Sequence, residues 1–192
     1  VCQQLAASVG AQVVMSATGL LRLIKLGLPA PGTAVAVNDT TMVQDSLKIA
    51  QRVPVRPAVR LGYCRNWTVQ TALQTGIPAE HKDLYAKEWL TVTSTDSTVA
   101  TNYKLSDEAV QEDTLLLKTT DAQTEADRRR DLRKVQRTVF ASRNYADLML
   151  AELGNAATLT SARFGLGSGV SGQIVAISRD LMAARVDIEV YT

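Results

Sequence analysis

The carboxy-terminal residues 157–192 constrain the fold of this chain more than any other stretch. Apolar and polar side chains alternate over residues 185–191, so Val186, Ile188 and Val190 share one face of an extended chain. A register shift of one residue would expose all three, so the register is well specified. A second alternating run covers residues 172–178. The pattern predicts three short strands and two turns, at a sheet edge or at the seam of a barrel.

Turn and breaker residues organise the first part of the chain. Apolar side chains recur at helical spacing over residues 2–9, and Gly10 suits the left-handed position that ends a helix. Residues 11–26 are typical of a β-hairpin with Gly19 in its turn. The following residues, 27–32, include two prolines and two glycines, so no strand continues through them.

The middle of the chain combines strand patterns with a helix. Residues 35–70 are rich in β-branched side chains, and within them the odd positions 59, 61 and 63 are predicted to be buried. The pattern becomes helical over residues 78–90, where Pro78 suits the first turn. Residues 91–103 return to the composition of a strand.

A second helix is predicted over residues 120–137, with acidic residues in its first half and basic residues in its second. The acidic segment 106–114 is interpreted as a solvated loop, because it lacks the glycine and the ligand spacing of a metal-binding loop. Residues 138–152 are predicted to form a strand that ends in a turn at Gly154.

These patterns together predict an α+β fold that is mainly β. We expect antiparallel β-barrel or sandwich domains with two inserted surface helices, near residues 78–90 and 120–137. The predicted domains are a small helix-plus-hairpin unit over residues 1–32, part of a domain that begins upstream, and a β-rich domain over residues 33–192.

The composition is that of a globular protein. Of 192 residues, 46% are hydrophobic and 21% are charged, and the formal net charge is +2. Such a small charge implies no general attraction to nucleic acid or to an anionic membrane. No stretch approaches the roughly eighteen apolar residues of a membrane-spanning helix. Cys2 and Cys64 lie far apart and are interpreted as reduced thiols, with a disulfide between them as the alternative.

Residues 167–172 read G-S-G-V-S-G, a literal match to the dinucleotide-binding pattern G-x-G-x-x-G. That motif binds pyrophosphate only when a helix follows the glycines, because the helix amino terminus supplies the N–H groups. Here a strand pattern follows at residues 173–178. We therefore interpret residues 165–172 as a turn, and no cofactor is expected.

No catalytic or metal-binding constellation is found. The single histidine, His81, lies between acidic neighbours at a helix start, but it has no identifiable nucleophile as a partner. One histidine and two distant cysteines do not match the spacing of a zinc site. We expect His81 to be a surface residue, and the protein not to be an enzyme.

A cluster of cations is the candidate interaction surface. Clusters of this kind bind phosphate groups, but the interleaved acids and the lack of stacking aromatics favour a solvated helix face with salt bridges. Its members are Arg128, Arg129, Arg130, Arg133, Lys134 and Arg137.

Three stretches resemble one family of proteins. They are VCQQLAASVGA with the following GLLRL at residues 1–11 and 19–23, RLGYCRNWTVQ at residues 60–70, and the segment from residue 159 to residue 190 that ends in R-V-x-I-x-V. They look like the carboxy-terminal part of tail-tip, or baseplate hub, proteins of long-tailed bacteriophages and related phage-like particles.

The resemblance implies a β-barrel-rich subunit of the virion tail that is assembled in the host cytoplasm. It would form a trimer around the tail axis and join the tail tube or a distal tail protein to tip, spike or fibre proteins. DNA would pass through the assembly without sequence-specific binding, and no stable membrane insertion is expected. The arginine-rich helix would face a neighbouring subunit or the channel.

The alternative hypothesis is a carbohydrate- or receptor-binding β-module of a virion. Such a module presents exposed aromatic rings to sugars. The chain has only Trp67, Trp89 and five tyrosines for this role, and most of them occupy positions that we expect to be half-buried.

Overall fold

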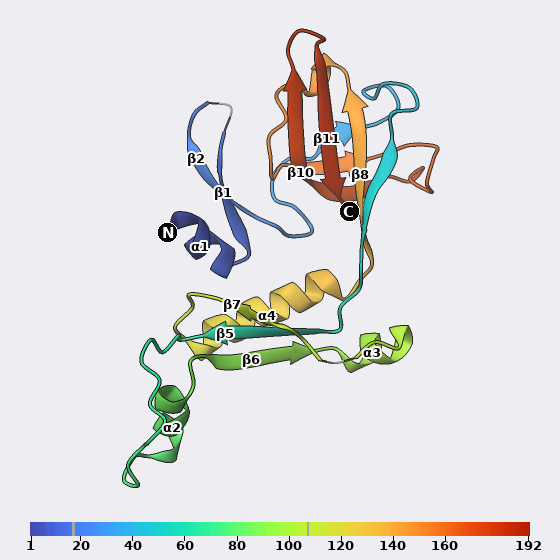
Figure 1. Ribbon diagram of the computed structural model, residues 1–192. Coiled ribbons are helices and arrows are strands. Elements are labelled where there is room, and N and C mark those ends of the chain that lie inside the picture. The colour runs from blue at the N-terminus through green and yellow to red at the C-terminus, as the bar shows by residue number, and fades with distance from the viewer. Residues whose placement is uncertain (17, 107) are drawn as a thin grey trace. The chain divides into compact units, whose positions relative to one another are not determined.

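The computed structural model describes residues 1–16, 18–106 and 108–192, apart from the side chain of Glu80. These residues form two compact units, each made of two separate segments of the chain. Unit 1 contains Val1–Ala11 and Arg56–Val135, and unit 2 contains Gln12–Val55 and Gln136–Thr192. Figure 1 labels the helices and strands of both units.

The elements of unit 1 are α1 (Cys2–Ser8), β5 (Ala58–Tyr63), α2 (Ala79–Ala86), β6 (Leu90–Thr95), α3 (Ser97–Tyr103), β7 (Gln111–Asp113) and α4 (Thr119–Arg133). The elements of unit 2 are β1 (Ala11–Met15, whose first residue belongs to unit 1), β2 (Leu21–Lys25), β3 (Val35–Val37), β4 (Lys48–Val53), β8 (Arg137–Asn144), the 3-10 helix η1 (Ala146–Leu148), β9 (Ala156–Leu159), β10 (Val170–Asp180) and β11 (Arg185–Tyr191).

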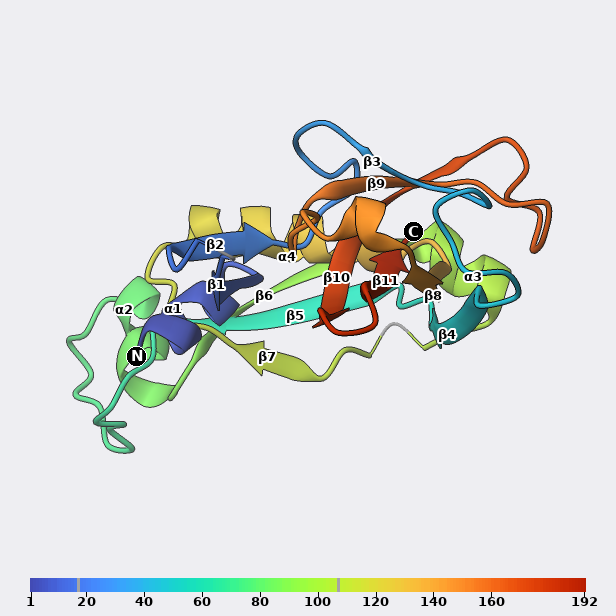
Figure 2. The same cartoon turned by 90° about the horizontal axis from the view of Figure 1, so that it is seen from above.

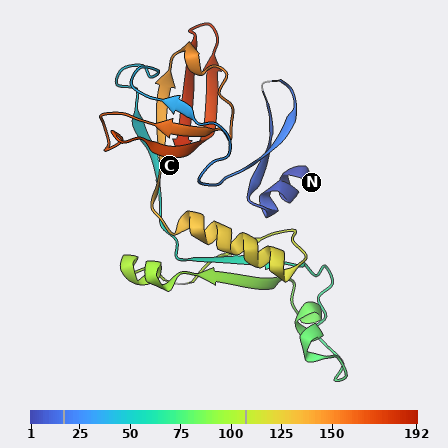
Figure 3. The ribbon, with the colours of Figure 1, turned by 180° about the vertical axis from the view of Figure 1, so that it is seen from behind.

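Unit 1 is a three-stranded sheet with a helix on one face. Its strands lie in the order β6-β5-β7, in which β5 pairs antiparallel with β6 and parallel with β7. Helix α4 lies along this sheet (Figure 3). Val59, Leu61 and Tyr63 of β5 pack with Ala122 and Ala126 of α4 in the core of the unit. The predicted buried face of β5 is confirmed, and the small alanines let the helix approach it closely.

The helix ends of unit 1 depend on particular residues. The predicted helix near the amino terminus is confirmed as α1, and Gly10 follows it with a φ of +64°. The predicted strand over residues 91–103 is wrong in its second half, because β6 ends at Thr95 and α3 follows. The side chain of Asp96 starts α3 by accepting a hydrogen bond of 3.1 Å from the Val99 N–H.

Unit 2 is built on a six-stranded sheet in the order β3-β9-β10-β11-β8-β4. The three predicted closing strands are confirmed as β9, β10 and β11, and Val186, Ile188 and Val190 are fully buried. The expected edge position is wrong for β11, because it pairs antiparallel with both β10 and β8. Figure 2 shows β3 beside β9, with which it pairs in parallel.

Strands β1 and β2 form the predicted hairpin, with Gly19 in its turn at a φ of +81°. The side chain of Gln173 on β10 holds the end of this hairpin. Its Nε2 donates to the Lys25 carbonyl oxygen over 3.2 Å, and its Oε1 accepts from the Gly27 N–H over 3.1 Å. Gln173 is buried, so these bonds satisfy its amide group.

The division into units differs from the predicted division at residue 32. Residues 1–11 belong to unit 1, and most of the hairpin belongs to unit 2 with the carboxy-terminal strands. Hydrophobic patterns reveal elements along the sequence but not the pairing of distant segments. A domain upstream of Val1 stays a prediction.

The predicted fold class, α+β and mainly β, is confirmed. The sheets are mixed and not purely antiparallel, because β3 pairs with β9, and β5 with β7, in parallel. Among the described strands no sheet closes into a barrel, since β3 and β4 are the outermost strands of the largest sheet. The expected barrel is therefore wrong, and the described residues form four α-helices where three were expected, the additional one being α3.

Candidate interaction surface

The predicted cation cluster does not lie on one helix. Helix α4 ends at Arg133, four residues earlier than expected, and Arg137 is the first residue of β8 in unit 2. The structure brings five of the six cations together, on or directly after α4: Arg128, Arg129, Arg130, Arg133 and Lys134.

Glu125 is the centre of the contacts on α4. Its side chain is nearly buried, and it accepts hydrogen bonds of 2.7 and 2.8 Å from Arg128 and one of 2.8 Å from Arg129. Burial alone would raise the pKa of Glu125, but the two guanidinium groups outweigh it and lower the pKa to about 2. Glu125 is therefore a carboxylate at neutral pH.

Arg129 joins three elements of unit 1. Besides Glu125, it donates over 2.7 Å to Glu112 on β7 and over 2.8 and 3.1 Å to the Ala7 and Ser8 carbonyl oxygens at the end of α1. A cation at a helix carboxy terminus also interacts favourably with the helix dipole. Arg129 therefore attaches α1 and β7 to α4.

Glu112 receives a second cation, because Arg133 also bonds to it. Burial would raise the pKa of Glu112, but the hydrogen bonds from Arg133 and Arg129 lower it below its ordinary value. The expectation that residues 106–114 form a solvated loop is thus wrong for β7. Sequence spacing did not indicate this contact, since Glu112 and Arg133 lie 21 residues apart.

Arg130 and Lys134 also have acidic partners. Arg130 donates to Asp127 and to Asp131, and over 2.8 Å to the Ser94 hydroxyl on β6. Lys134 lies 3.0 Å from Asp131. The salt-bridged helix face expected from the alternating charges is therefore present, and its role toward a neighbouring subunit stays a prediction.

The other residues singled out in the sequence show no constellation. His81 lies exposed on α2, and the two cysteines are free thiols. Strand β10 begins within the glycine pattern, at Val170, so a strand is present where a phosphate site needs a helix. Among the described residues, no group of three or more His, Cys, Asp and Glu side chains is placed to hold a metal ion. The helices in that part of the chain are too short or too polar to cross a membrane.

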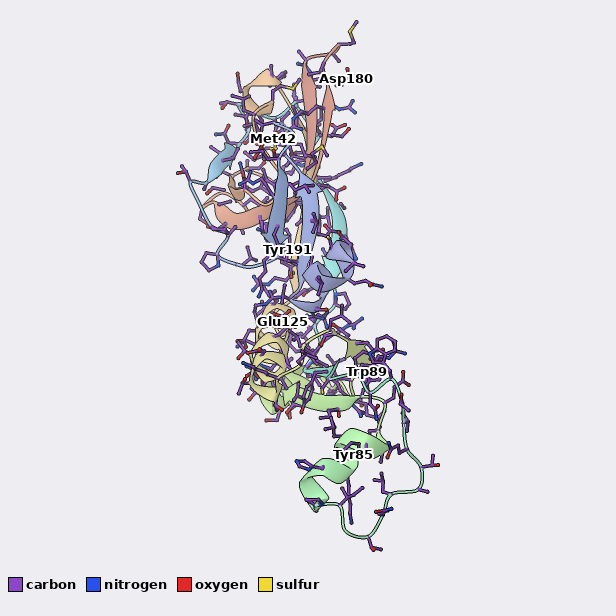
Figure 4. All side chains as sticks on the ribbon, turned by 90° about the vertical axis from the view of Figure 1, so that its left-hand side faces the viewer. Met42, Tyr85, Trp89, Glu125, Asp180 and Tyr191 are labelled. Carbon is purple, nitrogen blue, oxygen red and sulfur yellow. The ribbon has the colours of Figure 1, made fainter. Side chains whose placement is uncertain are left out.

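The segment between β5 and β6, residues 64–89, carries an exposed tryptophan and is called the arm here. Trp67 is 76% exposed, contrary to the expectation of a half-buried position. The Arg65 guanidinium lies 4.0 Å from the centre of the Trp67 ring and 5.3 Å from that of Trp89. Arg65 is itself held over 2.8 Å by Glu88. In Figure 4, Tyr85 marks α2 and Trp89 marks the end of the arm, directly before β6.

Asn66 fixes the base of the arm. Its Nδ2 donates over 3.0 Å to the carbonyl oxygens of Leu84 and Tyr85 in the last turn of α2, and its Oδ1 accepts from the Thr68 N–H over 2.9 Å. The orphan carbonyl groups of a helix end are thereby satisfied. Trp67 is therefore exposed on a backbone that its neighbours hold in place.

A groove lies on the outer face of the large sheet in unit 2, opposite the core. Its volume is about 790 Å³, and β4, β8, β11 and β10 form its floor. Small side chains, Ala141 and Ala176, stand side by side with Glu189 in the register of these strands. Arg143 and Asp187 form an ion pair of 2.8 Å at the same face. We call this feature the sheet groove.

Comparison with known proteins supports the fold. No protein-family model and no curated protein matches the chain. It is similar to a chain in the virion of a native gene transfer agent particle, with a TM-score of 0.60 and 14% identity over 99% of this chain and 37% of that chain. Weaker likenesses are to the tail protein from Neisseria meningitidis MC58 (TM-score 0.48, 11% identity, 97% of this chain and 52% of that one) and to prophage tail protein gp18 from Listeria monocytogenes EGD-e (0.43, 11%, 95% and 48%).

At these identities the likeness shows the fold alone. The chain has the fold of part of a virion protein, which confirms at the level of fold the resemblance inferred from the sequence. It spans 37% of the length of the virion chain that it matches.

Proposed function

We propose that this chain is a structural component of a bacteriophage tail tip or baseplate hub, where it joins the tail tube to distal tip or fibre proteins. The observation that carries the proposal is the shared fold with a virion chain over 99% of this chain. Host attachment and genome delivery belong to the same proposal, because a tail tip is where both take place.

We propose further that the protein acts through protein contacts and not as an enzyme. The support for this is the chemistry of the ionisable groups that meet between α4 and β7. There Glu125 and Glu112 are each paired with guanidinium groups that lower the pKa of the carboxyl. Such pairs neither take up nor release a proton near neutral pH, so they are better suited to holding the elements of unit 1 together than to acid–base catalysis.

In this proposal the chain assembles with copies of itself, as a trimer around the tail axis, within the virion and after synthesis in the host cytoplasm. Its partners are the tail tube or a distal tail protein on one side and tip, spike or fibre proteins on the other. DNA passes through the assembly without sequence-specific contacts. Closed rings of this kind use head-to-tail contacts between identical subunits.

The test is the position of the chain in intact particles. We expect gold particles on an epitope-tagged chain to label one end of the tail in negative-stain images, and mass measurement of isolated tails to give three copies. Label on the capsid, or tails of unchanged structure and infectivity without the chain, would contradict the proposal.

The alternative of a carbohydrate-binding module depends on Trp67, the most exposed of the described aromatic side chains. Sugar sites combine such a ring with polar side chains that are free to bind hydroxyl groups. Around Trp67 the polar side chains Arg65, Asn66 and Glu88 are engaged in bonds within the arm. The structure therefore gives this alternative little support, and a glycan array that shows binding would revive it.

A further inference from the structure

Strand β6 in unit 1 is an outer strand whose free edge has none of the usual protection. Sheet edges are commonly protected by shortness, charged side chains, proline or a bulge, because their unpaired N–H and C=O groups can pair with another chain. The other outer strands of the two larger sheets are protected: β3 and β7 have three residues each, and β4 has Lys48, Arg52 and a register shift. Strand β6 has six residues, no charge, no proline and an unbroken register with β5.

The free backbone groups of β6 belong to three threonines. Along an antiparallel strand, residues alternate between those that exchange hydrogen bonds with the neighbouring strand and those whose groups point away from it. The Asp96 N–H donates over 2.8 Å to the Pro57 carbonyl oxygen of the β5 side, which fixes this alternation. The N–H and C=O groups of Thr91, Thr93 and Thr95 therefore point to the free edge. Among the described residues no strand lies on that side of β6 (Figure 1).

This edge is complementary to itself. When two copies of β6 lie antiparallel with Thr93 at the centre, Thr93 faces Thr93 of the second copy, and Thr91 faces Thr95 of the second copy. Each such pair exchanges two hydrogen bonds, so the outward groups of all three threonines are satisfied in one register. A shift by two residues leaves one threonine of each copy without a partner. Every pair joins two β-branched side chains, and no like charges meet.

Helix α4 leaves this edge accessible. Val92 of β6 lies in the same core as Ala122 and Ala126 of α4, so the helix covers the buried face of β6. The side chains of the three threonines are exposed on the opposite face. Pairing of two edges would therefore make one continuous sheet, in the order β7-β5-β6-β6-β5-β7, with the α4 helices of both copies on one face.

We propose that the free edge of β6 pairs antiparallel with the β6 edge of a second copy of this chain, about a two-fold axis at Thr93. The symmetry of the edge selects a second copy as the partner, because the same strand supplies every group that its own outward groups need. The inference goes beyond the proposed function and does not rest on it. A two-fold contact closes on itself, so it joins copies in pairs and is distinct from the head-to-tail contacts of the proposed trimer.

The first experiment measures the mass of the purified full chain against concentration by sedimentation equilibrium. We expect the wild-type chain to form pairs, and Thr93→Lys to raise the concentration needed by at least about tenfold, because two ammonium groups then face each other across the axis. Thr93 is exposed, so this variant should keep its fold, which circular dichroism checks. The matched control is Thr33→Lys, at an exposed threonine of unit 2, and it should pair like the wild type.

The decisive experiment mixes Thr93→Lys with Thr93→Glu. Each variant alone places two like charges across the axis and should stay monomeric where the wild type pairs. The mixture places a cation opposite an anion, so a one-to-one pair of the two variants should form. Only a contact in which position 93 faces itself allows opposite charges at this single position to restore pairing.

Hydrogen exchange of the wild-type chain locates the contact without any substitution. The amides of Thr91, Thr93 and Thr95 should exchange more slowly as the concentration rises, whereas those of Gln111–Asp113 at the other edge of the sheet should not change. A wild-type chain that stays monomeric, undiminished pairing of Thr93→Lys, a mixture without pairs, or association that leaves the three threonine amides unprotected would each overturn the inference. The position of the chain in tails tests the proposed function separately, so either can fail alone.

Discussion

Glu125 keeps its charge although it is only 5% exposed, because Arg128 and Arg129 compensate for the water that it loses. Removing one partner of a buried ion pair destabilises a protein more than replacing both partners with apolar side chains, because the remaining partner is left as an uncompensated charge. The arginines that the sequence suggested for an outside partner are thus partly used inside unit 1.

The pKa of Glu125 makes unit 1 sensitive to acid. Folding lowers this pKa from 4.5 to about 2, so between these values the unfolded chain binds a proton that the folded chain does not. The stabilisation of the folded state by the ionised Glu125 side chain is complete above pH 4.5 and is lost as the pH falls toward 2. We expect it to amount to about 3 kcal/mol of the free energy of unfolding.

Urea titrations of the wild type and of Glu125→Gln at a series of pH values measure this contribution. The difference in the free energy of unfolding between the wild type and Glu125→Gln should shrink steadily below pH 4.5, because protonation of Glu125 makes the wild type resemble the variant. Asp131→Asn alters a half-exposed carboxylate of the same helix whose pKa the bonds from Lys134 and Arg130 also lower, so its difference from the wild type should have the same sign but be smaller. A difference that is independent of pH would contradict the assignment.

The alternation of buried and exposed side chains in β11 provides two neighbouring substitutions with opposite expected results. Ile188 is 1% exposed, so Ile188→Asp places a carboxylate in the core and should destabilise unit 2 by more than about 4 kcal/mol. Its neighbour Glu189 faces the other side of the sheet, and Glu189→Gln should change stability by less than about 0.5 kcal/mol. Soluble yield and urea midpoints test both, and an unaffected Ile188→Asp would show that the register is wrong.

At the scale of the element, the glycine pattern of residues 167–172 serves strand pairing. A Cβ on Gly172 would lie 2.6 Å from the Tyr191 carbonyl oxygen and 2.6 Å from the Val190 Cγ1 of β11. A Cβ on Gly167 would meet nothing within 4 Å. The last glycine of the motif is thus required by the close approach of β11 to β10, and no bound phosphate need be invoked for it.

We therefore expect Gly172→Ala to lower the free energy of unfolding by about 2 kcal/mol, because the backbone of β11 must shift. Gly167→Ala, in the same motif, should stay within about 0.5 kcal/mol of the wild type. Denaturant unfolding of the two variants measures both changes in the free energy of unfolding. Equal effects would mean that the motif has another role.

Sequence patterns predicted elements better than contacts. Strand β11 was predictable because one of its faces is buried and the alternation of its side chains records it. In β10 a register shift between Ile174 and Ala176 breaks the alternation that the sequence suggested. Helix α3 was not predictable, since its residues Thr98 and Val99 favour strands, whereas the Asp96 side chain caps the helix. The exposure of Trp67 and the pairing of Glu112 depend on residues distant in the sequence, so no local pattern reports them.

At the scale of the whole molecule, the described chain has two separate hydrophobic cores. One joins β5 to α4 in unit 1, and the other lies in unit 2 around Val186 and Ile188. Units with their own cores can unfold separately. The assignment of chain segments to the two cores can therefore be tested by following the unfolding of each unit.

We expect calorimetry to show two unfolding transitions. Glu125→Gln should lower the midpoint of one, and Val186→Ala, which removes fully buried methyl groups, should lower the midpoint of the other by an amount that corresponds to about 2 kcal/mol. Hydrogen exchange of β6 and β11 amides identifies which transition is which. A single transition that both substitutions shift would show that the units unfold together.

The order of strands in the large sheet has a consequence for synthesis on the ribosome. Strand β11, the latest of the six in the sequence, lies between β10 and β8, whereas unit 1 is complete once Val135 has been added. Unit 1 can therefore fold while translation continues, but the sheet of unit 2 must wait until Tyr191 leaves the exit tunnel. A chain that terminates before β11 leaves two inner strands without their shared neighbour, and their unpaired backbone groups make it a better substrate for proteases than the complete chain.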